Sequence, residues 1–204
     1  MFSPDSKFMD MIGRITDLVL LNLIFLITCL PLFTIGAAVS AMYTVCFRLM
    51  REECSGIFKA YLRAFKDNFR QGTLAFLILA AVIVPAVYYF SFLVKLDGIL
   101  RYACLPFILI IIAGLMTGSY VFPWISQFEN TAVQALTNAL ILSVSRLPRT
   151  VCILAINLMP PIVWFVNPDL FLQISFLWVA LYFAAAAYMN AGLLWHVFKP
   201  YRTA

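Results

Sequence analysis

Long runs of apolar residues divide this sequence and restrict what it can fold into. A helix needs about 20 predominantly apolar residues to cross a bilayer core. Strands of a membrane barrel would instead show short segments of alternating apolar and polar residues. The sequence therefore predicts an all-α, polytopic membrane protein, a helical bundle with six transmembrane helices. We expect these helices at residues 15–31, 35–50, 73–94, 102–126, 150–167 and 170–196.

The composition supports one membrane domain. Hydrophobic residues make up 64% of the 204 residues and charged residues 11%, whereas about 25% of a soluble domain is charged. We expect a single transmembrane domain over residues 1–204, with cytoplasmic amphipathic elements at 51–72 and 129–149. A continuous helix over 15–50 would be about 54 Å long, so the chain is expected to turn at Pro31 and Gly36.

The basic residues predict which side of the membrane each segment occupies. If the six runs all cross, every Lys and Arg except Lys95 and Arg101 falls on one side. Positive residues are enriched on the cytoplasmic side, so both termini are expected in the cytoplasm. Since the net charge of +5 is explained by membrane orientation, we predict contact with the lipid bilayer and no nucleic-acid partner.

The residues needed for enzymatic chemistry are missing from the pattern. The five cysteines are far apart and form no CxxC pair, so we expect reduced, packed thiols and no metal site. His196 is the only histidine, and no catalytic motif accompanies it. The sequence predicts neither an enzyme nor a cofactor. Small residues four apart, at Gly36/Ser40, Ala37/Ala41 and Ala187/Ala191, predict close helix packing.

The segment 51–72 reads as an amphipathic helix. One side holds four basic residues, and the other holds aromatic and aliphatic ones. We expect this helix to lie at the headgroup level, with its bases toward anionic lipid. The alternative is a docking surface for an acidic protein. The predicted lipid contacts are Lys59, Arg63, Lys66 and Arg70.

The segment 129–149 resembles the cytoplasmic loop of sugar-type ABC permeases. That loop has Glu at its first place and Leu-Pro at its nineteenth and twentieth, as Glu129, Leu147 and Pro148 do here, although Ala135 replaces its Gly. Asn130 and Thr131 replace its Ala pair. The resemblance implies a coupling helix that docks on an ATPase through Glu129, Asn130, Ala135, Leu147 and Pro148. The alternative is an interfacial helix ended by proline.

Longer stretches resemble a bacterial family of membrane proteins. They are Thr28–Ala37, Phe65–Gln71, Tyr120–Pro123 and Phe128–Thr131. In these stretches the chain is similar to the YesL family, a domain of unknown function. The resemblance implies a multi-pass protein of the bacterial cell (inner) membrane. Genes of that family tend to lie beside carbohydrate ABC importers.

Two functions remain open. The first is a non-catalytic membrane component associated with a carbohydrate ABC importer, as an accessory or permease-like subunit, whose partners are importer subunits or their ATPase. The alternative is a stand-alone small-molecule membrane transporter. For that alternative, Asn157 beside Pro160 and Pro161 is typical of a broken helix near the bilayer midplane. A plain kink at the two prolines is the other interpretation.

Overall fold

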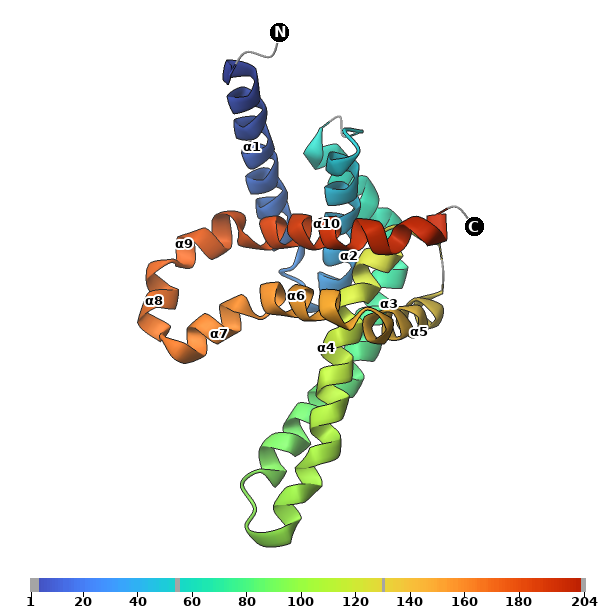
Figure 1. The fold of residues 1–204 in the computed structure, drawn as a ribbon, viewed down its shortest axis with the longest axis vertical. Helices are drawn as coiled ribbons and strands as arrows, with labels where there is room; N and C mark the ends of the chain where they lie inside the picture. Colours follow the sequence, from blue (N-terminus) through green and yellow to red (C-terminus); the bar gives the residue numbers. More distant parts are fainter. Residues whose placement is uncertain (1–3, 54–55, 130, 203–204) are drawn as a thin grey trace.

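The structure is a computed structural model and describes residues 4–53, 56–129 and 131–202. These residues form helices and short helical turns, with no strand among them, which confirms the all-α prediction (Figure 1). The elements are α1 (Pro4–Thr28), η1 (Leu32–Thr34), α2 (Ile35–Met50), α3 (Ile57–Leu93), η2 (Gly98–Cys104), α4 (Leu105–Ile125), α5 (Ala132–Ser145), α6 (Leu147–Asn157), α7 (Met159–Val166), α8 (Pro168–Gln173), α9 (Ser175–Leu177), the π-helix η3 (Trp178–Tyr182) and α10 (Phe183–Arg202).

Small residues bring α2 and α3 into direct backbone contact. A Cβ atom added to Gly36 would lie 2.1 Å from the carbonyl oxygen of Gly72, and one added to Gly72 would lie 2.8 Å from Cα of Ala37. Ser40 and Ala41 are buried on the same helix. Ala187 and Ala191 are buried on α10. The packing predicted from the small-residue pairs is confirmed.

The helix α3 is longer than the sequence predicts. Its 37 residues run from Ile57 to Leu93 without a break, so the boundary expected between an amphipathic helix at 51–72 and a span at 73–94 is absent. At 1.5 Å per residue α3 is about 55 Å long. The basic part that was expected at the headgroup level is thus continuous with the apolar part in one helix, and its contact with lipid stays a prediction.

The first and second halves of the chain run in different directions. α3 and α4 form a long hairpin, and α6 to α10 run across it (Figure 1). Prolines lie in the first turns of α6, α7 and α8. Because proline fits the first turn of a helix but interrupts its interior, each begins a new short helix. The continuous span expected at 150–167 is therefore replaced by α6 and α7.

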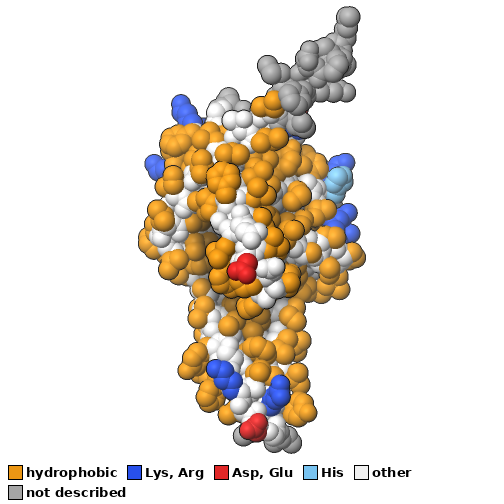
Figure 2. All heavy atoms as spheres, turned by 90° about the vertical axis from the view of Figure 1, so that its left-hand side faces the viewer, with side chains coloured by type: hydrophobic (Ala, Val, Ile, Leu, Met, Phe, Trp, Pro, Cys, Tyr) orange, Lys and Arg blue, Asp and Glu red, His pale blue; other side chains and the backbone are white. Residues whose placement is uncertain are grey.

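Four helical stretches are long and apolar enough to cross a membrane among the described residues. They are Leu32–Met50, Ile57–Leu93, Arg101–Ile125 and Ser175–Lys199. A fifth is possible if α5 and α6, bent by 107° against each other, count as one span. Hydrophobic side chains cover most of the face shown in Figure 2, with charged side chains at the lower tip and in the upper part and an acidic side chain near the middle. The structure is that of a membrane protein with four to five candidate spans, whereas the sequence predicts six.

Candidate functional site

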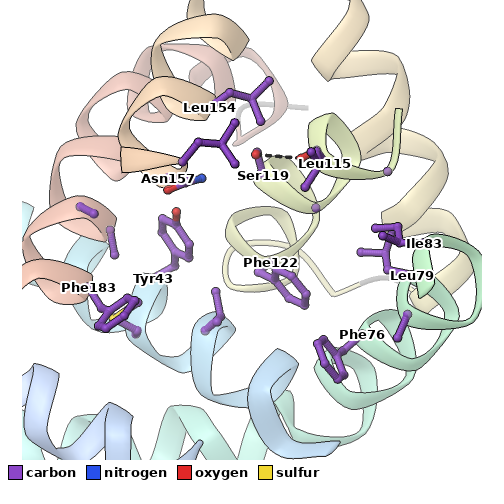
Figure 3. Close-up of a pocket in the computed structure, with 18 of the residues that line it drawn as sticks. Tyr43, Phe76, Leu79, Ile83, Leu115, Ser119, Phe122, Leu154, Asn157 and Phe183 are labelled. Carbon is purple, nitrogen blue, oxygen red and sulfur yellow. Dashed lines mark hydrogen bonds between the residues drawn. The ribbon is translucent and has the colours of Figure 1, made fainter. Parts of the chain in front are cut away.

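An apolar cavity lies where the two halves of the chain meet. Its volume is about 540 Å³, and α2, α3, α4 and α6 contribute to its wall together with η3 and α10. Figure 3 shows Phe76, Leu79 and Ile83 at one end and Tyr43 with Asn157 at the other. The remaining lining side chains are mostly aliphatic and aromatic.

The polar end of the cavity is a small amide and hydroxyl cluster. Asn190, which is fully buried on α10, donates from Nδ2 to Oδ1 of Asn157 at 2.8 Å and to the hydroxyl of Tyr43 at 3.3 Å. Its own Oδ1 accepts no hydrogen bond from the described residues. Asn157 and Asn190 are both unusual polar residues within predicted spans, and the structure brings them together at one site.

A helix break places Asn157 at the cavity. α6 ends at Asn157 and α7 begins at Met159, directly before Pro160 and Pro161. The hydroxyl of Tyr182 donates to the carbonyl of Ile156, so one of the carbonyls near the break has a partner from η3. The helix is interrupted at Leu158, next to Asn157 and the proline pair, and its position at the bilayer midplane stays a prediction.

The cavity lining indicates which ligands the cavity suits. None of the described residues that line it is Asp, Glu, Lys, Arg or His. Sugars need many hydrogen-bonding partners, whereas apolar walls with a few polar groups suit apolar or amphipathic molecules. The cavity also lacks the ionisable groups that ion-coupled transport uses inside a membrane.

The four predicted lipid-contact bases are exposed on α3, namely Lys59, Arg63, Lys66 and Arg70. The apolar side of this segment is divided. Tyr61 is fully buried and Phe65 packs against the core, whereas Phe58, Leu62 and Phe69 are exposed. The segment is thus held against the protein by part of its apolar face.

Arg70 and Glu129 meet at one surface depression, which we call the α3–α5 depression. Its volume is about 520 Å³, and it is lined by Arg70, Gln71, Leu74, Glu129, Thr131, Ala132 and Gln134. The sequence placed Arg70 and Glu129 in two separate elements. Neither has an ion-pair partner within 4 Å among the described residues.

A capping box fixes the start of α5 beside this depression. The backbone N–H of Gln134 donates to Oγ1 of Thr131 at 3.4 Å, and the N–H of Thr131 donates to Oε1 of Gln134 at 3.1 Å. This motif is not among the features predicted above, although Thr-x-x-Gln before an apolar run is its sequence signature.

The structure does not bring the other residues of the permease-like pattern together at one surface. Ala135 is fully buried in α5, so it cannot touch a partner and is removed from the predicted docking surface. Leu147 and Pro148 begin α6 instead of ending a helix. They are exposed and are not among the residues that line the α3–α5 depression. Asn130 lies outside the described residues.

Comparison with known families gives one match. Residues 18–91 match the family model described as "Protein of unknown function, DUF624". The match covers less than half of the chain, from α1 to nearly the end of α3, and agrees with the resemblance to YesL. No curated protein and no solved structure matches the chain.

The matched DUF624 region contains the Gly36–Gly72 contact and the basic residues of α3. Glu129 and the cavity residues Asn157 and Asn190 lie beyond it. Among the described residues there is no group of three or more His, Cys, Asp or Glu side chains that could hold a metal ion.

Proposed function

We propose that this protein is a non-catalytic membrane component that works with a carbohydrate ABC importer as an accessory subunit. The α3–α5 depression is its docking site for the importer. The observation that carries the proposal is the meeting of Arg70 and Glu129 at this depression, with neither charge engaged in an ion pair among the described residues.

The charges favour recognition by a protein. Complementary charged groups at an interface fix the register of two partners and suppress wrong ones. Glu129 and Arg70 on the rim of the depression would be complemented by a basic and an acidic side chain of the partner. Glu129 also keeps the first place of the permease-like pattern, and its side chain is exposed.

The accessory role is favoured over a subunit that lines the sugar pathway. The apolar cavity offers few hydrogen-bonding groups, among them Tyr43, Ser119 and Asn157, and a sugar loses many bonds to water on entering such a space. The proposal therefore assigns the pathway to the importer and the docking to this chain.

The proposal includes the position in the membrane. Six crossings, with both termini in the cytoplasm of a bacterial inner membrane, require α1 and the broken α6–α7 pair to cross in addition to the four candidate spans. The distribution of Lys and Arg supports this orientation, because only Lys95 and Arg101 fall on the outer side.

Photo-crosslinking tests the docking site in the full-length protein. A photoreactive amino acid replaces Val133, which is 65% exposed and leaves the Thr131–Gln134 capping box intact. With the matching importer co-expressed, we expect a crosslink to an importer subunit. Glu129→Lys or Arg70→Glu should remove it, whereas Asp169→Lys, an equal charge reversal on α8, should not.

Absence of any importer crosslink in the unaltered protein contradicts the proposal. A crosslink that survives both charge reversals contradicts the role assigned to Glu129 and Arg70. Membrane yield of each variant is measured in parallel, since both side chains are exposed and their substitution should not affect folding.

The second candidate is a stand-alone transporter of apolar or amphipathic molecules. The helix break at Asn157, which faces a 540 Å³ cavity, favours it. Purification in mild detergent followed by mass spectrometry separates the two. Importer subunits in the preparation support the accessory role, and a single homogeneous species supports the transporter.

A further inference from the structure

A second polar pocket lies at the end of α2, away from the α3–α5 depression. Arg48 and Arg51 line it together with Glu53, with Ser126 and Gln127 just after α4, and with Tyr201 of α10. Its volume is about 530 Å³. Two arginines one turn apart face a single acid here, so the pocket carries a net positive charge.

Arg51 is held in place from three sides. Its Nη2 donates to Oε1 of Gln127 at 2.8 Å, its Nη1 lies 3.8 Å from Oε2 of Glu53, and its guanidinium carbon lies 5.4 Å from the centre of the Trp195 ring. A guanidinium fixed in this way is preorganised for an anion, because its planar fork loses little freedom on binding.

The side chain of Arg48 has N–H donors that could bind a ligand. It lies in the last turn of α2 and is half-buried in the pocket wall. No hydrogen-bond acceptor or carboxylate is paired with its side chain among the described residues. A guanidinium has five N–H donors, so the donors of Arg48 are available to an anionic ligand in the pocket.

The position of the pocket at the end of a candidate membrane span indicates the source of its ligand. The candidate span Leu32–Met50 ends between the two arginines, and Trp195 and Tyr201 lie beside them. Tryptophan and tyrosine are enriched at the level of the lipid headgroups, and basic pockets between membrane helices bind anionic headgroups.

We propose that Arg48 and Arg51 form a binding site for the phosphate group of an anionic ligand, and that an anionic membrane lipid presents this phosphate. Arginine binds phosphate through paired N–H donors. Gln127 orients Arg51 for this contact, and Arg48 supplies the unpaired donors. The site is independent of the docking proposal, because none of its residues lines the α3–α5 depression.

Native mass spectrometry of the full-length protein tests the lipid source. The protein in mild detergent is titrated with phosphatidylglycerol or with phosphatidylcholine of the same acyl chains. We expect preferential retention of phosphatidylglycerol, which Arg48→Gln weakens about tenfold. Arg146→Gln removes the same charge from an exposed position after α5 and should leave the retention unchanged.

Thermal unfolding of the same variants tests the soluble source. Glycerol phosphate or inorganic phosphate that stabilises the unaltered protein but not Arg48→Gln, without a preference for phosphatidylglycerol, keeps the phosphate site and assigns it a soluble ligand. No preference for either probe overturns the proposal. An equal loss of lipid in Arg48→Gln and Arg146→Gln also overturns it, because general charge would then explain the binding.

Discussion

At the scale of single residues, Gly36 and Gly72 control how closely α2 and α3 approach. Each has backbone atoms of the other helix closer than 3 Å to the place where a Cβ would be. Backbone atoms cannot move aside as a flexible side chain can. In a membrane, where helices associate through close packing, this contact contributes directly to stability.

We predict that Gly72→Ala destabilises the protein by about 1–3 kcal/mol, the usual cost of overpacking. Gly118→Ala is the matched control, because its nearest contact would be Leu79 Cδ1 at 3.9 Å. Unfolding temperature in detergent measures both. Equal stability of the two variants would show that the α2–α3 contact yields without cost.

A second prediction concerns Asn22 on α1, which binds the backbone around the π-helix η3. Its Nδ2 donates to the carbonyl of Val179 at 2.5 Å, and its Oδ1 accepts from the N–H of Ala184 at 2.9 Å. Asn22→Leu leaves both backbone groups without this partner, so we expect a loss of about 1–3 kcal/mol. Gln173→Leu, at an exposed amide on α8, should cost little in the same unfolding measurement.

At the scale of the elements, helix starts explain most differences between the predicted and the observed helices. Leu147-Pro148 in the permease-like pattern predicts the end of a helix, but proline at the first turn begins α6. The change from a basic to an apolar composition near residue 72 predicts a helix boundary. The helix has no boundary there, because Gly72 is buried within α3 against Ala37. A change of composition alone breaks no backbone hydrogen bond.

The third prediction tests the capping box of α5. Thr131→Ala removes the acceptor for the N–H of Gln134, which should lower stability by about 0.5–2 kcal/mol. Thr137→Ala in the same helix is the control, since Thr137 only bonds the carbonyl of Val133 one turn back. Thr131→Ser should restore most of the loss. Equal effects at positions 131 and 137 would mean that the cap contributes nothing.

At the scale of the whole molecule, local patterns predicted more than tertiary arrangement. The turn at Pro31, the small-residue packing pairs and the helix interruption after Asn157 are local patterns and are found, whereas the structure has four to five candidate spans where six apolar runs are expected. The meeting of Arg70 with Glu129, the burial of Ala135 and the course of α6 to α10 across the α3–α4 hairpin depend on contacts between distant segments. The spacing of residues along one sequence does not predict such contacts.

The fourth prediction tests the proposed orientation. In a variant without the five native cysteines, Asp97→Cys and Thr137→Cys place thiols at exposed positions after α3 and within α5. A membrane-impermeant reagent should label position 97 only from outside and position 137 only after the cytoplasm is opened. Ala135→Cys, at a fully buried site, controls for labelling of unfolded protein. Labelling of both exposed positions from one side contradicts the proposed orientation.

The unbroken helix α3 has a mechanical consequence. Gly72, where α3 touches α2 most closely, lies well inside the helix, with the basic residues on one arm and the α3–α4 tip on the other. Pro85 interrupts the backbone hydrogen bonds of α3 beyond this point, so the stretch from Ile57 to Val84 is the part that can turn as one rod. Turning it by about five degrees about Gly72 would carry Val84 about 1.5 Å in one direction and Ile57 about 2 Å in the other.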